Sequence, residues 1–451
     1  MKKKLILLYS LFLPIIAFAQ ESSTSEKIDA NFRALTQWFV DAIFYAIPIT
    51  DTISIPWVLI VLLGGATYFT LTFKFAQIRL LKTSIKVVKG DYDKIDEEGA
   101  QDVHPSEDDL SIVDGDLPET IKIEGHHGEV SHFQALTAAL SATVGLGNIA
   151  GVAVAISIGG PGATFWMILA GLLGMASKFA ECTLGVKYRD VGPDGTVYGG
   201  PMYYLTKGLK EKGLGGFGKI LAVFFAIMVV GGSFGGGNMF QSNQAAAQFI
   251  KLFGFENANA GMYFGIIMSI IVAIVIIGGI KRIASVTEKI VPFMAVIYVG
   301  AALVILVLDF RLIPQAFGEI INGAFSPIGI TGGFVGVLIQ GFRRGTFSNE
   351  AGVGSAAIAH SAVKTKYPAS EGVVALLEPF IDTVIICTMT ALVLVITNIK
   401  GNFFNYGIEI KEGVELTASA FDSVIPHFSI VLTIAVILFA FSTMISWSYY
   451  G

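Results

Sequence analysis

Charged residues are scarce in this chain of 451 residues: Asp, Glu, Lys and Arg together make up 14% of it. A soluble globular protein carries about a quarter charged residues. With 53% hydrophobic residues and a mean hydropathy of +0.69, the sequence predicts an all-α polytopic membrane protein. Its formal net charge of −5 is thinly spread, so no nucleic-acid partner is expected.

Cysteine and histidine are scarce as well. The two cysteines, Cys182 and Cys387, lie far apart in apolar segments, which excludes a disulfide framework and favours small buried side chains. The six histidines are scattered and suggest neither a metal cluster nor a nucleophile with its base, so the chain is not expected to be an enzyme. No repeated filter sequence of the kind that lines a channel is present, which makes a passive channel a less favoured alternative.

The N-terminal part of the chain divides into four segments. Residues 1–20 combine a lysine cluster, an apolar run and a small-x-small site, which is the layout of a cleaved signal peptide. Residues 21–52 are amphipathic and are expected at the membrane surface on the non-cytoplasmic side. Residues 53–73 predict a spanning helix. The stretch 74–132, basic at first and then acidic, predicts a cytoplasmic loop.

Further hydrophobic segments follow and form a predicted helical core over residues 133–451. They span 133–158, 163–187, 217–250, 261–280, 288–308, 333–360, 372–397 and 428–450. The loops that this order places in the cytoplasm hold most of the Lys and Arg residues, as the positive-inside rule requires. We therefore expect a multi-pass protein of a bacterial-type inner membrane, surrounded by membrane lipid, with its mature N-terminus outside the cytoplasm.

The first of these core segments is interrupted. From Ser141 to Ala163 it reads SATVGLGNIAGVAVAISIGGPGA, and glycines together with the polar Thr143 and Asn148 break an otherwise apolar helix. Such a break frees backbone N–H and C=O groups that hydrocarbon cannot satisfy, so it must face protein or a cavity that holds an ion or a solute. The alternative is a glycine-rich helix that packs closely on its neighbours.

The sixth segment carries a matching interruption. Between Gly341 and Ala362, glycines and the polar residues Ser348, Asn349 and Glu350 interrupt the apolar run. Paired broken helices in corresponding positions of two halves indicate a transporter site built on inverted repeats. A second half that opens here needs two more helices than the chain supplies, so the C-terminal core helices are expected to be absent from this chain.

Four stretches carry a family resemblance: Ser141–Ala163, Tyr198–Tyr203, Gly345–Ser355 and Ser442–Gly451. Together they resemble the alanine/glycine:cation symporter family over nearly all of residues 130–451. The run TVGLGN from Thr143 to Asn148 is also similar to the broken first helix of the bacterial leucine transporter. The resemblance implies a 5+5 inverted-repeat transporter core with broken first and sixth helices, to which the 53–73 helix is added in front.

The resemblance also implies a function. It predicts a secondary active transporter that imports a small neutral amino acid, alanine or glycine, by sodium symport with alternating access. Sodium is then the coupled ion. A proton-coupled transporter of the same fold is the alternative.

The first break offers both partners that an amino-acid zwitterion needs, because one half-helix ends in carbonyls and the next begins with amides. We therefore expect Gly145, Gly147 and Asn148 to bind the substrate, with helix capping as the alternative role of Asn148. Gln241 and Gln244, one turn apart on the third segment, either reach the substrate or join neighbouring helices.

Side chains near the end of the chain are expected to shape the substrate pocket. Trp447 lies four residues after Thr443, on the same helical face, where the two would close around a small side chain. An interfacial aromatic anchor is the equal alternative for Trp447. Phe347 would form another wall. Elsewhere, Glu181 follows Lys178 by three residues, and this spacing predicts an ion pair between them.

Sodium ligands are implied by the resemblance, position by position, and all of them are hard oxygen donors. One site would join the first and eighth core helices through Ser141, Val144, Ser442 and Thr443. A second site would combine Thr143, Asn148 and Ser348. Hydroxyls that bond to the carbonyls of their own preceding turn are the alternative for Ser442 and Thr443.

Overall fold

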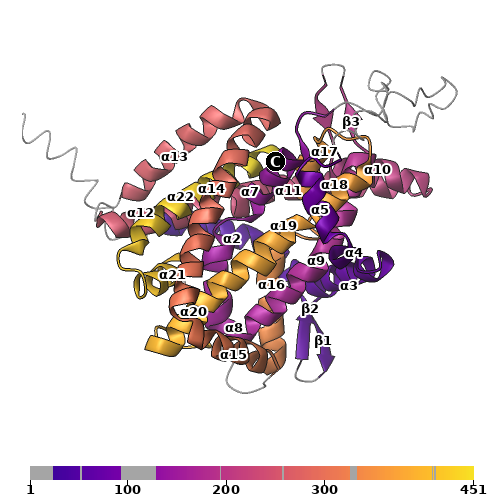
Figure 1. Ribbon diagram of the computed structural model, residues 1–451. Coiled ribbons are helices and arrows are strands. Elements are labelled where there is room, and N and C mark those ends of the chain that lie inside the picture. Colours follow the sequence, from indigo (N-terminus) through magenta and orange to yellow (C-terminus); the bar gives the residue numbers. More distant parts are fainter. Residues whose placement is uncertain are drawn as a thin grey trace, which may run out of the picture. The chain divides into compact units, whose positions relative to one another are not determined.

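The computed structural model describes most of the chain (Figure 1). The described residues are 24–50, 53–92, 128–192, 195–255, 259–325, 333–408, 410 and 413–451. The predicted signal peptide 1–20 and most of the predicted acidic loop 74–132 lie outside them. The chain divides into two compact units, residues 1–61 and residues 62–451.

The first unit holds the amphipathic helix α2 (Thr24–Ile43) and a hairpin of β1 (Ala46–Thr50) and β2 (Ile53–Pro56). The hairpin shortens the spanning helix that was predicted for 53–73, because the alternating, β-branched start of that segment pairs with β1. Helix α3 begins only at Trp57 and has 16 residues. At 1.5 Å per residue it measures about 24 Å, less than a bilayer core of about 30 Å requires.

The second unit is mostly helical. Its elements up to the end of the third core segment are the part of α3 (Trp57–Thr72) from residue 62 onward, α4 (Ala76–Arg79), α5 (Leu81–Val88), α7 (His132–Thr143), the π-helix η3 (Gly147–Gly151), α8 (Val152–Gly159), α9 (Gly162–Lys187), β3 (Asp190–Val191), β4 (Val197–Tyr198), α10 (Pro201–Glu211), α11 (Gly215–Phe234), the π-helix η4 (Gly235–Met239) and α12 (Phe240–Phe253). The two short strands form an antiparallel hairpin.

The remaining elements are helical as well. They are α13 (Ala260–Ile276), α14 (Gly279–Leu308), the 3-10 helix η5 (Phe310–Leu312), α15 (Ile313–Phe325), α16 (Gly333–Asn349), α17 (Ala356–Ser361), α18 (Pro368–Ala375), α19 (Leu377–Pro379), the π-helix η6 (Phe380–Cys387), α20 (Thr388–Gly401), α21 (Gly413–Asp422) and α22 (Phe428–Tyr450). The predicted hydrophobic core segments thus all coincide with helices.

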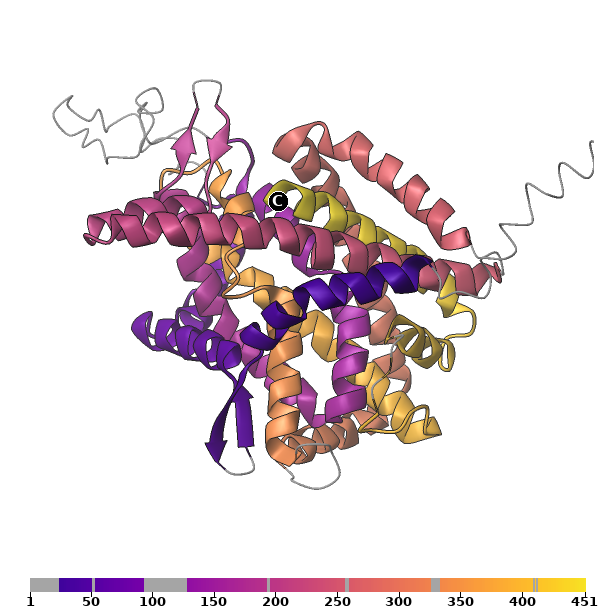
Figure 2. The same ribbon diagram turned by 180° about the vertical axis from the view of Figure 1, so that it is seen from behind.

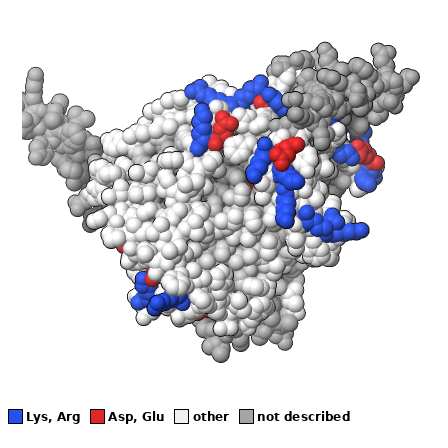
Figure 3. All heavy atoms as spheres, in the orientation of Figure 1, with Lys and Arg blue, Asp and Glu red and all other residues white. Residues whose placement is uncertain are grey.

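Within the described residues, five helices are long and apolar enough to cross a membrane, or six if the bent pair α7 and η3–α8 counts as one span. Fewer spans result than were predicted, because α3 and α13 have only 16 and 17 residues and the sixth segment divides into α16 and α17. In Figure 3 most charged side chains gather near β3, α5 and α18 and a smaller group lies near α20, with a wide uncharged area between them.

The two interrupted segments lie against each other in the interior of the second unit. Helix α9 packs along α16, α17 and α18, while α22 packs against α7, α12 and α14 (Figures 1 and 2). The halves of the interrupted segments also meet: α7 contacts α17, and α8 contacts α16. This arrangement brings the two breaks into one buried region.

Candidate functional site

The structure has an interruption at both predicted places. The axes of His132–Thr143 and Gly147–Gly159 enclose an angle of 51°. In the sixth segment, α16 ends at Asn349, and Glu350 follows with a left-handed φ of 54°. Gly352 and Gly354 also have positive φ, of 87° and 89°. A right-handed helix cannot continue through such residues, so α17 starts anew.

Asn148, fully buried on η3, connects the first break to the rest of the site. Its Oδ1 accepts the backbone N–H of Gly145 at 2.8 Å, so the side chain satisfies a donor that the first break frees. Its Nδ2 donates to Oγ of Ser348 at 3.1 Å and to Oδ1 of Asp382 at 2.6 Å. Asn148 therefore satisfies a backbone donor at the break and joins η3 to α16 and η6.

Asp382 is a further functional candidate that lies outside the predicted substrate and sodium residues. Its carboxylate is fully buried on η6, and Oδ2 accepts hydrogen bonds from Ser348 at 2.8 Å and Thr383 at 2.6 Å. In the part of the chain that the structure describes, no Lys, Arg or His forms an ion pair with it. A carboxylate at membrane depth is costly without a partner, and this could have marked Asp382 from the sequence.

Hydrogen-bond acceptors outnumber donors around Nδ2 of Asn148. This NH₂ group has two N–H bonds but four acceptors within 3.3 Å: Oγ of Ser348, the backbone O and Oδ1 of Asp382, and Sγ of Cys387. Thr143, which was predicted here, instead bonds back to Ala139 and Leu140 on its own helix. Of the second predicted sodium set, Asn148 and Ser348 therefore lie together, whereas Thr143 does not contact them. The carboxylate of Asp382 contacts both instead.

The first predicted sodium set joins α7 to α22. Oγ1 of Thr443 donates to the backbone O of Ser141 at 2.9 Å, and Oγ of Ser141 donates to the backbone O of Ser442 at 2.6 Å. Oγ of Ser442 turns back to the carbonyl of Phe439 at 3.0 Å, which is its alternative role. Val144, with ψ of 88°, ends α7 and is buried. Of the two predicted hydroxyl ligands, only that of Thr443 reaches across to α7.

The two candidate glutamines differ in their positions relative to the first break. Gln241 is buried, and its Oε1 accepts the backbone N–H of Leu146 at 3.3 Å while its Nε2 donates to the carbonyl of Gly236 at 3.0 Å. It thus satisfies a backbone group that the first break frees. Gln244 lies away from the break, in a pocket that also includes Lys251 and Glu415. The structure does not bring Gln244 to the site.

Both predicted aromatic walls lie beside a break. Phe347 on α16 faces Gly147, since a Cβ at that glycine would lie 3.8 Å from its ring. Nε1 of Trp447 donates to Oε1 of Glu350 at 3.0 Å, and its ring packs tightly on Gly237 of η4. Trp447 is therefore tied to the second break rather than anchored at an interface.

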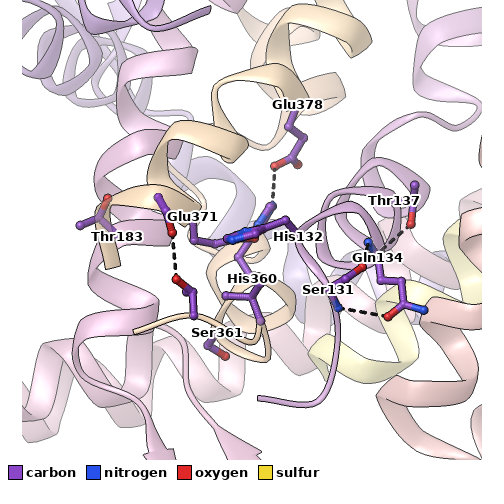
Figure 4. A network of polar contacts seen from close by, with 12 residues as sticks. Ser131, His132, Gln134, Thr137, Thr183, His360, Ser361, Glu371 and Glu378 are labelled. Carbon is purple, nitrogen blue, oxygen red and sulfur yellow. Dashed lines mark hydrogen bonds and ion pairs between the residues drawn. The ribbon is translucent and has the colours of Figure 1, made fainter. Parts of the chain in front are cut away.

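A second group of buried polar residues is here called the acid–base cluster, and Figure 4 labels His132, His360, Glu371 and Glu378 of it. Its members are Lys178, Glu378, His360, Glu371 and His132. The predicted pair of Lys178 with Glu181 was wrong, because Lys178 pairs with Glu378 at 2.9 Å. Glu181 instead accepts the backbone N–H of Gly352 at 2.7 Å, a donor that the second break frees.

Comparison with known proteins gives the chain its context. Residues 117–451 match the family described as the sodium:alanine symporter family. The sodium/alanine symporter AgcS of Methanococcus maripaludis is 42% identical over 397 residues, which cover 88% of this chain and 79% of that protein. The probable sodium/glutamine symporter GlnT of Bacillus subtilis is 33% identical over 396 residues, which cover 87% of this chain and 73% of that protein.

A solved structure shares the fold. The crystal structure of MhsT in complex with L-phenylalanine superposes with a TM-score of 0.50 at 16% sequence identity, and the match covers 72% of this chain and 74% of that one. The comparison therefore confirms a helical transporter fold of this kind, while the 5+5 inverted repeat and the absence of C-terminal core helices stay predictions.

Proposed function

Because the chain belongs to the sodium:alanine symporter family, we propose that it imports a small neutral amino acid, alanine or glycine, together with sodium and by alternating access. Family membership makes it a sodium-coupled amino-acid transporter and not an enzyme. The observation that carries the finer proposal is the meeting of both broken segments at Asn148, Ser348 and Asp382.

The acceptor-rich region around Asp382 suits a sodium ion. Sodium prefers hard oxygen ligands, and the carboxylate of Asp382 with the hydroxyls of Ser348 and Thr383 supplies them. The ion would also neutralise a buried charge. These ligands come from α16 and η6, and Asn148 links them to η3. Sodium binding here therefore stabilises one relative arrangement of the two broken segments.

The amino acid would bind next to this ion. The break at Gly145–Asn148 presents backbone amides for the substrate carboxylate and carbonyls for its ammonium group. Gly147 lies at the ring of Phe347, and Trp447 lies across the second break, so large substrate side chains would collide with these rings. This restriction favours alanine or glycine.

Coupling between sodium and the amino acid follows if both bind more tightly to the same conformation. Sodium and substrate would both stabilise the arrangement in which the breaks face each other, so each raises the affinity for the other by the same factor. A second ion position remains available where Thr443 meets the carbonyl of Ser141. Opening would then separate either the halves α7 and α17 or the halves α8 and α16, which form the two ends of the site.

The test is uptake of labelled alanine and glycine into proteoliposomes with and without an inward sodium gradient. We expect sodium-stimulated uptake that Asn148→Ala abolishes and that Gln244→Ala leaves unchanged, since Gln244 lies away from the break. Uptake driven by a proton gradient but indifferent to sodium would favour the proton-coupled alternative. Uptake without need of any gradient would favour a channel, and failure to carry either amino acid would overturn the substrate assignment.

A further inference from the structure

The acid–base cluster has no part in sodium or substrate binding as proposed above. It alternates bases and acids drawn from α9, α19, α17, α18 and α7 (Figure 4). Lys178 pairs with Glu378, His360 lies between Glu378 and Glu371, and Glu371 also pairs with His132. All five side chains are buried. Such a chain of ionisable groups inside a membrane protein marks an ion or proton pathway by default.

His360 is the centre of the cluster. Its Nδ1 lies 2.5 Å from Oε1 of Glu371, and its Nε2 lies 3.7 Å from Oε2 of Glu378. Both Nε2 of His360 and Oε2 of Glu378 are buried and have no hydrogen-bond partner. A neutral imidazole carries one N–H and can serve only one carboxylate, whereas the protonated ring donates to both. A proton on Nε2 of His360 therefore supplies the positive charge and the donor that face Oε2 of Glu378, and it turns this contact into an ion pair.

We propose that His360 binds a proton that holds the cytoplasmic side of the transporter closed. The inference rests on the proposed transport function. Glu371 contacts His132 at the start of α7 and His360 on α17, so a single carboxylate joins one half of each broken segment. The charge pattern of the loops predicts that this end faces the cytoplasm. Opening there would pull α17 away from its carboxylates.

The charge on His360 decides how tightly this end is held. A protonated ring donates a charge-assisted hydrogen bond to Glu371 and forms an ion pair with Glu378 at 3.7 Å, and both interactions are stronger than those of the neutral ring. The proton-bound state therefore favours the closed end, and loss of the proton favours opening. By linkage, opening in turn lowers the affinity of His360 for its proton by the same factor.

Other titratable or charged groups surround α17. They lie on the elements packed against it and next to its ends: Lys178, Glu181 and Cys182 of α9, His132 of α7, Glu350 before α17, Arg189 and Tyr198 at the β3–β4 hairpin, and Tyr449 and Tyr450 of α22. Arg189 donates to the backbone carbonyls of Ser361 and Val363 and so holds the end of α17. Because these groups can also titrate, the test must isolate the contribution of His360.

The test measures sodium-driven alanine uptake by the full chain in proteoliposomes at a constant sodium gradient, with pH stepped from about 5.5 to about 8.5 on both sides. In the wild type, acid slows uptake, by at most about tenfold per pH unit for one proton. His360→Gln keeps sodium-driven uptake and makes it independent of pH. The control His427→Asn changes an exposed histidine with left-handed φ, which asparagine tolerates, and keeps the wild-type profile.

Contrary outcomes are distinct. Sodium-driven uptake by the wild type that does not vary with pH overturns this inference and leaves the proposed function intact, and so does a wild-type pH profile in His360→Gln. Absence of sodium-driven uptake at every pH overturns the proposed function itself. If His360→Gln does not fold, Glu371→Gln decides: it removes the carboxylate that lies 2.5 Å from Nδ1 of His360, so the midpoint of the pH profile must move to lower pH, and an unmoved midpoint overturns the inference.

Discussion

The side-chain amide of Asn148 lies 2.6 Å from Oδ1 of Asp382, although the two residues are 234 positions apart in the chain. The contact joins the π-helix of the first broken segment to the π-helix of the span Pro368–Gly401. Ser348 at the end of the other broken segment bonds to both residues. Three segments of the core are therefore fixed to one another at a single buried carboxylate.

Asp382→Asn tests this carboxylate as a sodium ligand. The amide has nearly the same shape but no charge, so we expect the sodium concentration for half-maximal uptake to rise by about 100-fold, which corresponds to about 2.7 kcal/mol. Sodium titration of alanine uptake measures it. Asp309→Asn is the control, because Asp309 pairs with Lys400 outside the site. An unchanged sodium dependence would show that Asp382 does not bind the ion.

Gly145→Ala tests the contact between the first break and α22. A Cβ at this position would lie 2.7 Å from Oγ1 of Thr443, so the hydroxyl must move and lose its bond to the carbonyl of Ser141. Overpacking of this kind costs about 1–3 kcal/mol, and we expect uptake to fall by about tenfold or more. Gly151→Ala is the matched control, since no atom lies within 4 Å of its Cβ position. Equal effects of both changes would contradict the assignment.

Gln241→Ala and Gln244→Ala compare the roles of two glutamines that lie one helical turn apart. Loss of Gln241 leaves the backbone N–H of Leu146 without its acceptor at the break, which costs about 1–3 kcal/mol for a buried group. We therefore expect a rise of about tenfold in the alanine concentration for half-maximal uptake. Gln244→Ala should stay close to the wild type. A larger effect at Gln244 than at Gln241 would mean that the pocket by Lys251 takes part in transport.

Lys178→Met tests the stability of the acid–base cluster. Lys178 and Glu378 are both fully buried, and removal of one partner leaves an uncompensated charge, at a cost of about 3–5 kcal/mol. We expect a clear loss of thermal stability in detergent. Lys400→Met breaks a partly exposed pair with Asp309 and should cost at most about 1 kcal/mol. Restored stability in Lys178→Met combined with Glu378→Leu would confirm the cause.

Much of the helical architecture could be predicted, because local composition determines it. The lengths of the hydrophobic runs predicted the helical segments. The glycines and Asn148 predicted the first break, where the chain bends by 51°. The match of Ser141 to Thr443 followed from resemblance and appears as a hydrogen bond between α7 and α22. The segments and the break depend on residues next to them in sequence, whereas the match of Ser141 to Thr443, 302 positions away, depends on the resemblance.

Contacts between distant segments could not be predicted in the same way. Asp382 looked isolated because its partners Asn148 and Ser348 lie on other segments. Lys178 had an acid one turn away, yet Glu378 on another helix proved to be its partner. The start of α3 also moved, since pairing with β1 outweighed the apolar length of the segment. In each case packing between segments overrode a local preference.

The three π-helices of the described residues all border the site: η3 carries Asn148, η4 packs against Trp447, and η6 carries Asp382. A π-helix bonds each N–H to the carbonyl five residues before it, so it holds one residue more than the α-helix around it. Deletion of one residue between Asp382 and Cys387 would turn the following helix by about 100° and separate these two groups. The alignment of the site therefore depends on segment length, and these short stretches should accept no insertion or deletion.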